Sequence, residues 1–173
     1  MPEREGVAAK LSPVNVLSDF AAFYEREHVR LYRSLLLLTR SREEAEDLSH
    51  EAFVRVLQRW ERVAAMEAPS AYLYRTALNL RRNALRRLLR RAKSGGEPPE
   101  VQADASGPGI ARAELFRVLG ELSQEQREAL VLVDFLGFTS QEAAVVLRID
   151  PEAVRARLHR GRARVRKELI EHG

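Results

Sequence analysis

The stretch TSQEAAVVLRIDPEAVRARLHRGRARVRK, residues 139–167, decides the fold of the C-terminal half of the chain. Thr139 is followed three positions later by Glu142, and this capping box predicts that a helix begins there. Asp150 is a suitable N-cap for a second helix, and Pro151 suits its first position because the N–H that proline lacks would be unpaired there. Only two residues separate the predicted first helix from this second cap. Helices joined so tightly must cross steeply, which predicts a helix-turn-helix.

The second helix of this motif has two contrasting faces. A stripe with helical spacing is expected to be buried, and consists of Val154, Leu158, Gly161, Val165 and Leu169. The other side is basic, with no acid between Glu152 and Glu168, and carries Arg155, Arg157, His159, Arg160, Arg162, Arg164, Arg166 and Lys167. Such a helix fits a DNA major groove, with its early residues at base edges and its later arginines at phosphates. A basic run alone is equally consistent with a solvated surface, but the short turn and two caps favour DNA binding.

The composition suits a helical protein of one or two small domains. Of the 173 residues 45% are apolar, which is ordinary for a folded protein, and 31% are charged with few aromatics, which suits helices. The net charge of +4 is modest, so local patches matter more than the total. The absence of cysteine excludes disulfides and thiolate metal sites. Neither an apolar run long enough for a membrane span nor a signal-peptide pattern is found, so a cytoplasmic location is expected.

Two helices are predicted at the start of the N-terminal half. The first begins after Ser18, and its core stripe is Phe20, Phe23, Tyr24, Leu31, Leu35 and Leu38. The second begins with a capping box, Ser41 and Glu44, and runs to about Trp60. Its buried stripe is Ala45, Leu48, Ala52, Phe53, Val56 and Trp60. The opposite, polar face is consistent, on spacing alone, with nothing more than solvent contact.

A third, strongly basic helix follows the connection 61–68 and runs from Pro69 to about Arg91. Its apolar stripe is Leu73, Ala77, Leu80, Ala84 and Leu88. Its positive residues are Arg75, Arg81, Arg82, Arg86, Arg87, Arg90, Arg91 and Lys93. Tyr72, Tyr74 and Asn79 lie near its start, and aromatics among arginines can stack on unpaired bases while the charges contact phosphate. The alternative, equally consistent with the pattern, places the tyrosines in the core and the arginines in solvent.

Residues 94–109 have the composition of a linker, rich in Gly, Pro and Ser, with three acids and no base. Beyond it, Gly120 is expected to end one helix, Ser123 with Gln126 to cap the next, and Gly137 to end that one. We therefore predict an all-α fold of two small helical domains, 18–92 and 111–170, joined by a flexible acidic linker, 93–110. The C-terminal domain contains the helix-turn-helix.

The sequence carries no catalytic motif. His50 and Glu51 begin like a zinc-protease motif, but Val54 occupies the place of the second histidine. Neither a phosphate-binding loop nor a Gly-x-Ser-x-Gly nucleophile elbow is found. We expect no enzymatic activity, no metal site and no cofactor.

Four segments resemble conserved regions of bacterial sigma factors of the sigma-70 family: residues 45–53 and 72–79 resemble region two, and residues 119–127 and 154–162 resemble region four. Two helical domains with no room for a third between them are similar to the extracytoplasmic-function group, also called group four. This resemblance covers about residues 18–169. It implies a bacterial cytoplasmic protein that binds core RNA polymerase and directs promoter recognition, melting and transcription initiation.

The resemblance also implies three sets of site residues. Contacts to the beta-prime clamp helices of the polymerase would come from Asp47, Leu48, His50, Glu51 and Arg55. Capture of a flipped base of the minus-ten element, and binding of the melted strand, would involve Met66, Glu67, Tyr72, Arg75, Asn79, Arg82 and Arg86. The minus-thirty-five element would be read by Arg155, Ala156, Arg157, His159, Arg160 and Arg162. Further implied partners are the beta flap of the polymerase and an anti-sigma factor, and the linker would run through the polymerase cleft.

Several residues depart from the family pattern, most of them in the helix-turn-helix. Arg148 stands where glycine usually makes the turn, so a positive φ there would carry strain. Glu152 and Ala153 replace a usual Gly-Thr pair and Ala156 a usual serine, while Tyr72 replaces a common tryptophan and Asn83 a common aspartate. Because Glu152 would repel phosphate unless it points away, these changes favour a distinct promoter preference.

Two other functions compete with this interpretation. A stand-alone, dimeric helix-turn-helix transcriptional regulator would explain residues 139–167, but not the first basic helix or the acidic linker. It also requires a dimerisation surface, and no heptad repeat supplies one. A helical adaptor that binds only protein would leave the arginines to act merely in solubility, and it predicts no strong salt dependence of DNA binding.

Overall fold

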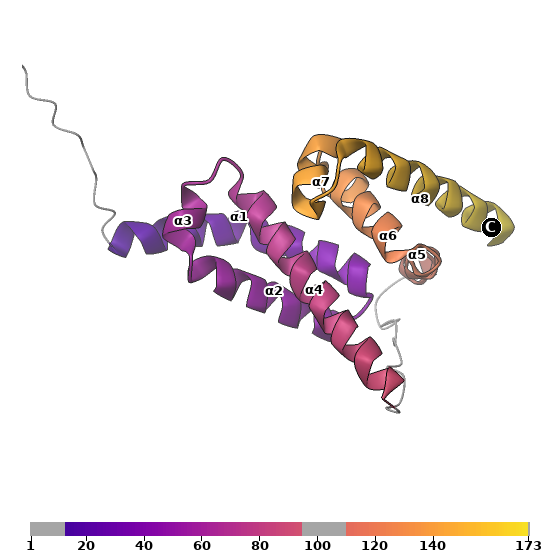
Figure 1. Ribbon diagram of the computed structural model, residues 1–173, viewed down its shortest axis with the longest axis horizontal. Helices are drawn as coiled ribbons and strands as arrows, with labels where there is room; N and C mark the ends of the chain where they lie inside the picture. Colours follow the sequence, from indigo (N-terminus) through magenta and orange to yellow (C-terminus); the bar gives the residue numbers. More distant parts are fainter. Residues whose placement is uncertain (1–12, 95–109, 173) are drawn as a thin grey trace, which may run out of the picture.

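The computed structural model describes residues 13–94 and 110–172, and these form two helical units (Figure 1). The N-terminal unit consists of α1 (Pro13–Thr39), α2 (Arg42–Leu57), α3 (Trp60–Ala64) and α4 (Pro69–Lys93). The C-terminal unit consists of α5 (Ile110–Gly120), α6 (Gln124–Leu130), a π-helical turn η1 (Val131–Phe135), α7 (Ser140–Leu147) and α8 (Pro151–His172). These described ranges contain no strand, and the prediction of an all-α fold is confirmed. Most of the predicted linker lies outside the described residues.

An aromatic cluster anchors the N-terminal unit. The ring of Phe23 on α1 lies 4.9 Å from that of Trp60 and 6.4 Å from that of Phe53, measured between centroids. The whole predicted stripe of α2 is buried, from Ala45 to Trp60, as the sequence predicts. Trp60 itself begins α3, so the predicted connection 61–68 contains a short helix. These contacts fix α2 and α3 against α1 and leave their outer faces exposed.

One predicted helix start and one predicted capping box differ from the structure. The first helix begins at Pro13, not after Ser18, because proline is well suited to the first turn of a helix. At Ser41 only half of the predicted capping box forms: its hydroxyl accepts from the Glu44 N–H at 3.3 Å, but its own N–H donates to Thr39 Oγ1 at 3.2 Å. Burial raises the pKa of the Glu44 carboxyl, an effect that the nearby Arg81 opposes.

Three residues predicted to be buried are exposed instead. Tyr24 is 40% exposed because its ring lies across the edge of the core, stacked on His28 and against Phe53. Leu88 is 36% exposed because the C-terminal part of α4 projects beyond the other helices (Figure 1). Leu169 is 49% exposed, and its neighbour Glu168 is buried in its place by ion pairs to arginines of α5 and α8.

The helix-turn-helix is confirmed in detail. Thr139 and Glu142 form a complete capping box, with the Thr139 N–H donating to the Glu142 carboxylate at 2.8 Å. Arg148 ends α7 with φ of 57°, the left-handed conformation that is strained for a residue with a Cβ atom. Ser123 and Gln126 form a second complete capping box at α6. Gly161 on α8 faces Leu130 so closely that an added Cβ would lie 3.0 Å from its Cδ1 atom.

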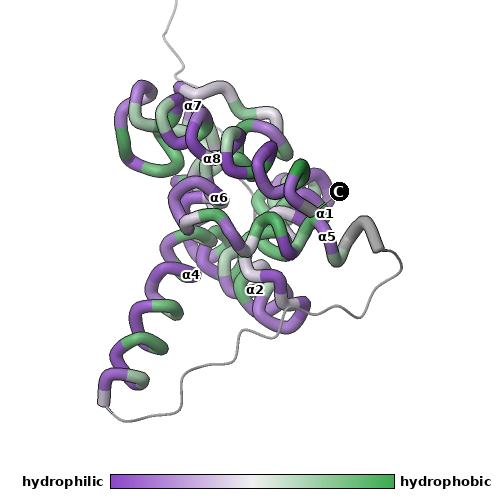
Figure 2. Tube along the Cα trace, turned by 90° about the vertical axis from the view of Figure 1, so that its right-hand side faces the viewer, coloured by the Kyte–Doolittle hydropathy of each residue, from purple (hydrophilic) through white to green (hydrophobic). Residues whose placement is uncertain are grey.

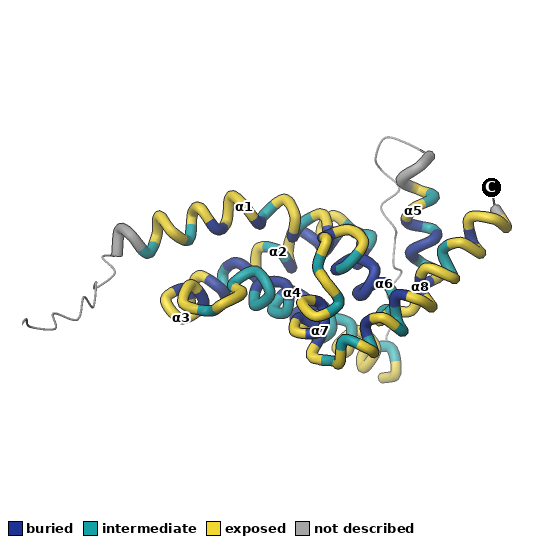
Figure 3. Tube along the Cα trace, turned by 90° about the horizontal axis from the view of Figure 1, so that it is seen from above, coloured by how far each residue is buried: buried dark blue, intermediate teal, exposed yellow. Residues whose placement is uncertain are grey.

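The two units pack directly against each other, which the sequence pattern does not indicate. The rings of Tyr74 on α4 and Phe138, just before α7, meet edge to face at 5.3 Å. Arg30 on α1 donates to the carbonyl of Leu136 at 2.9 Å. Figure 3 shows buried positions on the inner faces of α2, α4, α6 and α7, with exposed positions along their outer sides. One continuous apolar core therefore spans both units.

Within the described parts of the chain, no helix is both long and apolar enough to cross a membrane. The same parts contain no group of three or more histidine or acidic side chains placed to hold a metal ion.

Candidate nucleic-acid and polymerase interfaces

The solvent face of α8 carries the residues predicted to read DNA. Figure 2 shows hydrophilic residues along most of this helix. Arg155, His159, Arg160 and Arg162 are exposed, whereas Ala156 and Arg157 are half-buried at its edge. Arg157 points toward α6 instead, where it pairs with Glu125 at 3.4 Å, so four of the six predicted residues are exposed on the helix that follows the sharp turn at Arg148. Their arrangement is suitable for insertion into a major groove.

Acidic residues hold several of these arginines in place. Glu152 pairs with Arg155 one turn along the same helix, and this hydrogen bond lowers the pKa of the Glu152 carboxyl and raises that of Arg155. Arg162 forms a bidentate ion pair with Asp134, in which Nε donates to Oδ2 at 3.0 Å and Nη2 donates to Oδ1 at 2.5 Å. Glu152 is therefore neutralised by its neighbour, which reduces the phosphate repulsion expected from it.

A pocket of about 650 Å³ brings together predicted minus-ten residues in the N-terminal unit. It lies between α2, α3 and α4 and is lined by Glu51, Val54, Arg55, Gln58, Arg59, Arg62, Met66, Tyr72, Arg75, Thr76, Asn79 and Arg148. Tyr72 is its aromatic wall: Arg59 donates to the phenol oxygen at 3.2 Å, and the Arg75 guanidinium lies 5.4 Å from the ring centroid. An aromatic ring flanked by two cations can stack on a base and bind its phosphate.

The remaining predicted minus-ten residues lie elsewhere. Arg82 and Arg86 line a second pocket of about 390 Å³, between α4 and the C-terminal unit, together with Glu128 and Arg157. Glu67 is exposed in the connection before α4 and does not line either pocket. The seven predicted residues are therefore divided among three places: the Tyr72 pocket, the second pocket and the connection before α4.

Tyr74 belongs to the core, as the alternative interpretation of the tyrosines holds. Its hydroxyl donates to Glu27 at 3.3 Å, and Ser70 donates to the same buried carboxylate at 2.7 Å. Burial, followed by the nearby Glu27 charge, raises the pKa of the Tyr74 phenol. This residue positions α4 on α1 and is not available to a base.

The polar face of α2 presents most of the residues predicted to contact polymerase. Asp47, His50, Glu51 and Arg55 are exposed, and Arg55 donates to Glu51 at 2.7 Å. The fifth predicted residue, Leu48, is only 8% exposed and packs in the core. It lies on the opposite side of the helix because it belongs to the apolar stripe.

The sequence interpretation missed three arginines that line the first pocket: Arg59, Arg62 and Arg148. Arg59 lies just before the predicted connection 61–68 and Arg62 lies within it, and positive residues preceding the aromatic Tyr72 are a signal that could have identified them. Arg148 could not be found in this way, because it comes from the turn of the helix-turn-helix and reaches the pocket only through packing of the two units.

Two family models match the chain in order: sigma-70 region 2 over residues 23–91, and sigma-70 region 4 over residues 112–165. The RNA polymerase sigma-E factor of Streptomyces coelicolor is 31% identical, over 88% of this chain and 86% of its own length. This chain belongs to the sigma-70 family of RNA polymerase sigma factors. The ECF sigma factor SigM of Mycobacterium tuberculosis is 29% identical over 93% of this chain and 84% of its own length. The prediction of an extracytoplasmic-function member is confirmed.

A solved structure shows the same fold. The sigma factor RpoE, in complex with the anti-sigma factor NepR from Bartonella quintana, has a TM-score of 0.74 and covers 90% of this chain and 99% of that chain, at 21% identity. In the present chain, the family model of region 2 matches the N-terminal unit, which contains the Tyr72 pocket. The family model of region 4 matches the C-terminal unit, which contains the helix-turn-helix.

Proposed function

We propose that this chain binds core RNA polymerase as a sigma subunit and directs promoter recognition, melting and transcription initiation. The observation that carries the proposal is the order of regions 2 and 4 on one chain, each with its own candidate DNA-binding surface. Residues 18–92 would bind polymerase and the minus-ten element, residues 93–110 would link through the polymerase cleft, and residues 111–170 would bind the minus-thirty-five element. The chain would act in the bacterial cytoplasm, without enzymatic activity of its own.

In region 4, the start of α8 would read bases and its later part would contact phosphate. Arg155, Arg157 and Arg160 lie within the first three turns, where side chains of a groove-bound helix reach base edges. Arginine is well suited to this because its guanidinium can donate two hydrogen bonds to guanine. Arg162 lies two residues beyond Arg160 and is proposed to contact phosphate.

In region 2, the Tyr72 pocket would capture an unpaired base. Extraction of a base from the duplex costs a few kcal/mol, which stacking and phosphate contacts must offset. Tyr72 supplies the ring, Asn79 an amide that can both donate and accept, and Arg75 a charge beside them. Met66 adds an apolar wall. This pocket has the chemistry for recognition of a flipped base followed by a charged backbone.

The exposed face of α2, with Asp47, His50, Glu51 and Arg55, would bind the beta-prime clamp helices, and region 4 would dock on the beta flap. An anti-sigma factor is a further proposed partner, since one solved structure of similar fold is the sigma factor RpoE in complex with the anti-sigma factor NepR. A second is CnrH in complex with the cytosolic domain of CnrY. A stand-alone regulator is not favoured, because it gives no role to region 2.

Run-off transcription tests this proposal. Core polymerase with the wild-type chain should give promoter-specific transcripts, and core polymerase alone should not. Asp47→Lys should abolish them by reversing a charge on the face proposed to bind polymerase. The same charge reversal at the neighbouring exposed acid, Glu46→Lys, lies outside the proposed contact residues and should leave them. The proposal fails if no chain-dependent transcript appears while the purified chain binds duplex DNA tightly as a dimer.

A further inference from the structure

The first turn of α8 carries an acidic side chain on the helix that is proposed to read DNA. Glu152 is the acid of this turn, and no further acid follows on α8 before Glu168. The Glu152 side chain is 83% exposed, so packing in the core does not explain its presence there. Because a carboxylate beside DNA repels phosphate, its place on this helix requires a favourable contact that offsets the repulsion.

Glu152 lies at the end of a stripe of basic side chains on one face of α8. The residues that follow it at helical spacing line a pocket of about 480 Å³ between α8 and the start of α7: Arg155, His159, Arg162 and Arg166. Ser140, in the first turn of α7, lines the same pocket and adds a hydroxyl. A phosphate of the DNA backbone fits such a basic pocket, which leaves the first turn of α8 as the part nearest the base edges.

The contact between Glu152 and Arg155 uses only part of what each side chain offers. Arg155 donates from Nη2 to Oε1 and from Nε to Oε2, the latter at 3.4 Å. The Nη1–Nη2 edge of its guanidinium is left to donate two parallel hydrogen bonds. The carboxylate also keeps a lone pair on each oxygen with which it can accept. The pair can therefore donate to one base through Arg155 and accept from a second base through Glu152.

Base edges in the major groove distinguish these two side chains. Guanine presents two acceptors, O6 and N7, which match the outer edge of a guanidinium. Cytosine presents the N4 amino donor to a carboxylate, whereas guanine and thymine present acceptor oxygens that repel it. Adenine has an amino group too, but its neighbouring N7 acceptor also repels a carboxylate. Ala153 and Ala156 have no polar side-chain group that could read the same bases.

We propose that Glu152 is itself a base-reading residue, which selects a cytosine beside the guanine that Arg155 contacts. The pair then reads two adjacent base pairs of the minus-thirty-five element, one through an acceptor and one through a donor. Glu152 stands where the family usually has glycine, so this selection is a property of the present chain. The inference rests on the proposed function of region 4 as the part that reads the minus-thirty-five element.

Glu152→Gln tests this by exchanging one base preference for another. Glutamine has the size of glutamate, but its amide both donates and accepts, and so matches N6 and N7 of adenine. Holoenzyme with the full-length chain is incubated with promoters whose minus-thirty-five element is randomised, and the bound DNA is sequenced. The wild type should enrich cytosine next to guanine. The variant should shift the ratio of cytosine to adenine by about tenfold at that position alone, which is roughly 1.4 kcal/mol.

Asp134→Asn is the matched control. Asp134 also pairs with an exposed arginine of the same stripe, Arg162, but it lies on η1, and that arginine is proposed to contact phosphate. Its substitution removes one negative charge, as Glu152→Gln does. It should therefore tighten binding to all sequences alike and leave every base preference unchanged.

The proposal is overturned if the wild type shows no cytosine preference beside the guanine, or if Glu152→Gln keeps that preference. It is also overturned if the variant changes affinity for all sequences equally, or loses only the guanine preference, since Glu152 would then do no more than orient Arg155. Failure of the proposed function is recognised separately. In that case the wild-type holoenzyme enriches no minus-thirty-five element and gives no transcript, and the base-reading role of Glu152 falls with it.

Discussion

At the scale of single residues, the side chain of Arg155, proposed to read DNA, is oriented by its neighbour Glu152. Its partner Glu152 lies one turn earlier on the outer side of α8, where the pair is exposed. An ion pair in solvent contributes little to stability, so its effect is on the direction of the guanidinium. If Arg155 reads bases as proposed, Glu152 would restrict which base edge it can reach, and this would fit the departure from the usual glycine at that position.

Substitution of single basic residues of α8 by alanine should distinguish side chains that contact bases from side chains that contact phosphate. Arg155→Ala and Arg160→Ala should each cost about 1–3 kcal/mol at one base position and relax specificity there. Lys167→Ala, near the end of the helix, should weaken binding to every sequence alike and reduce the salt slope by roughly one. Binding of the holoenzyme to a panel of promoters with single base changes measures both. Uniform weakening by Arg155→Ala would make it a phosphate contact.

The cap of α7 gives a prediction for pH. Hydrogen bonds from the Thr139 backbone and hydroxyl lower the pKa of the Glu142 carboxyl below the ordinary 4.5. A lowered carboxyl pKa stabilises the fold above that value, and the stabilisation is lost as the pH falls through the folded pKa. Glu142→Gln keeps a cap but removes the charge. Its Tm should be below wild type at neutral pH, and the difference should shrink in acid below pH 4.5. An equal difference at both pH values would contradict this.

At the scale of elements, the close approach of α6 and α8 sets the orientation of the recognition helix. Gly161 is buried on α8, directly against Leu130 and Gln126 of α6. A side chain there would move α8 outward, and with it every residue proposed to contact the minus-thirty-five element. The sequence interpretation placed Gly161 in the buried stripe, and the structure supplies the reason.

Gly161→Val should lower the free energy of unfolding by about 1–3 kcal/mol, the usual cost of an overpacked site. Ala163→Val on the exposed face of the same helix is the control, and should cost only the lower helix propensity of valine, roughly 0.5 kcal/mol. Chemical denaturation measures both. If the two substitutions cost the same, Leu130 moves aside and the contact does not set the position of α8.

The helix starts and the turn of the C-terminal unit could be predicted from the sequence because residues close together in the chain determine them. The capping boxes at Thr139 and Ser123 fixed two helix starts, and the turn at Arg148 followed from two residues between helices. The exposure of Tyr24 and Leu169 was missed because both lie at the rim of a core, where apolar spacing continues beyond the neighbouring helix. The π-helical turn η1 has no sequence signal of comparable strength.

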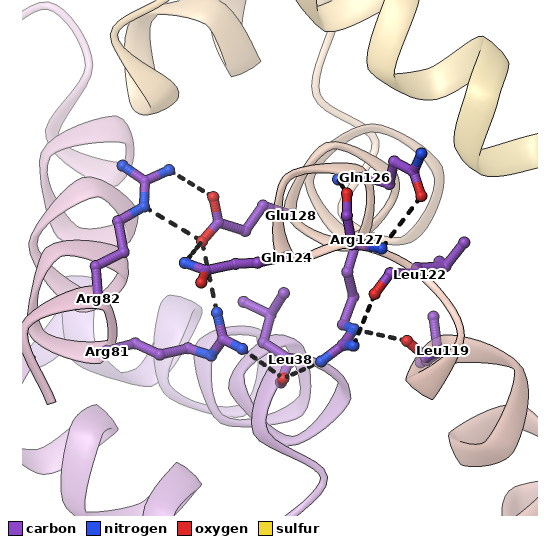
Figure 4. Close-up of polar contacts among 10 residues, drawn as sticks. Leu38, Arg81, Arg82, Leu119, Leu122, Gln124, Gln126, Arg127 and Glu128 are labelled. Atoms are coloured by element: carbon purple, nitrogen blue, oxygen red, sulfur yellow. Dashed lines mark hydrogen bonds and ion pairs between the residues drawn. The ribbon is translucent and has the colours of Figure 1, made fainter. Parts of the chain in front are cut away.

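At the scale of the whole molecule, the resemblance gave the family and the order of the two regions, but not their contact. That contact depends on polar groups far apart in sequence: Arg127 reaches the Leu38 carbonyl, and Arg82 reaches Glu128 (Figure 4). No periodic pattern encodes such pairs. Most of the proposed DNA-binding residues of α8 are therefore exposed, whereas region 4 covers part of the proposed DNA-binding surface of α4.

The central claim is that one chain uses two anchors on one promoter, and mapping of transcript 5′ ends tests it most directly. Genomic DNA of the source bacterium would be transcribed by core polymerase with and without the chain. We predict chain-dependent start sites that share two sequence elements at a fixed spacing. Arg155→Ala should alter preference only in the distal element, and Asn79→Ala only in the proximal one. Start sites that share a single element, or that do not depend on the chain, would contradict the account.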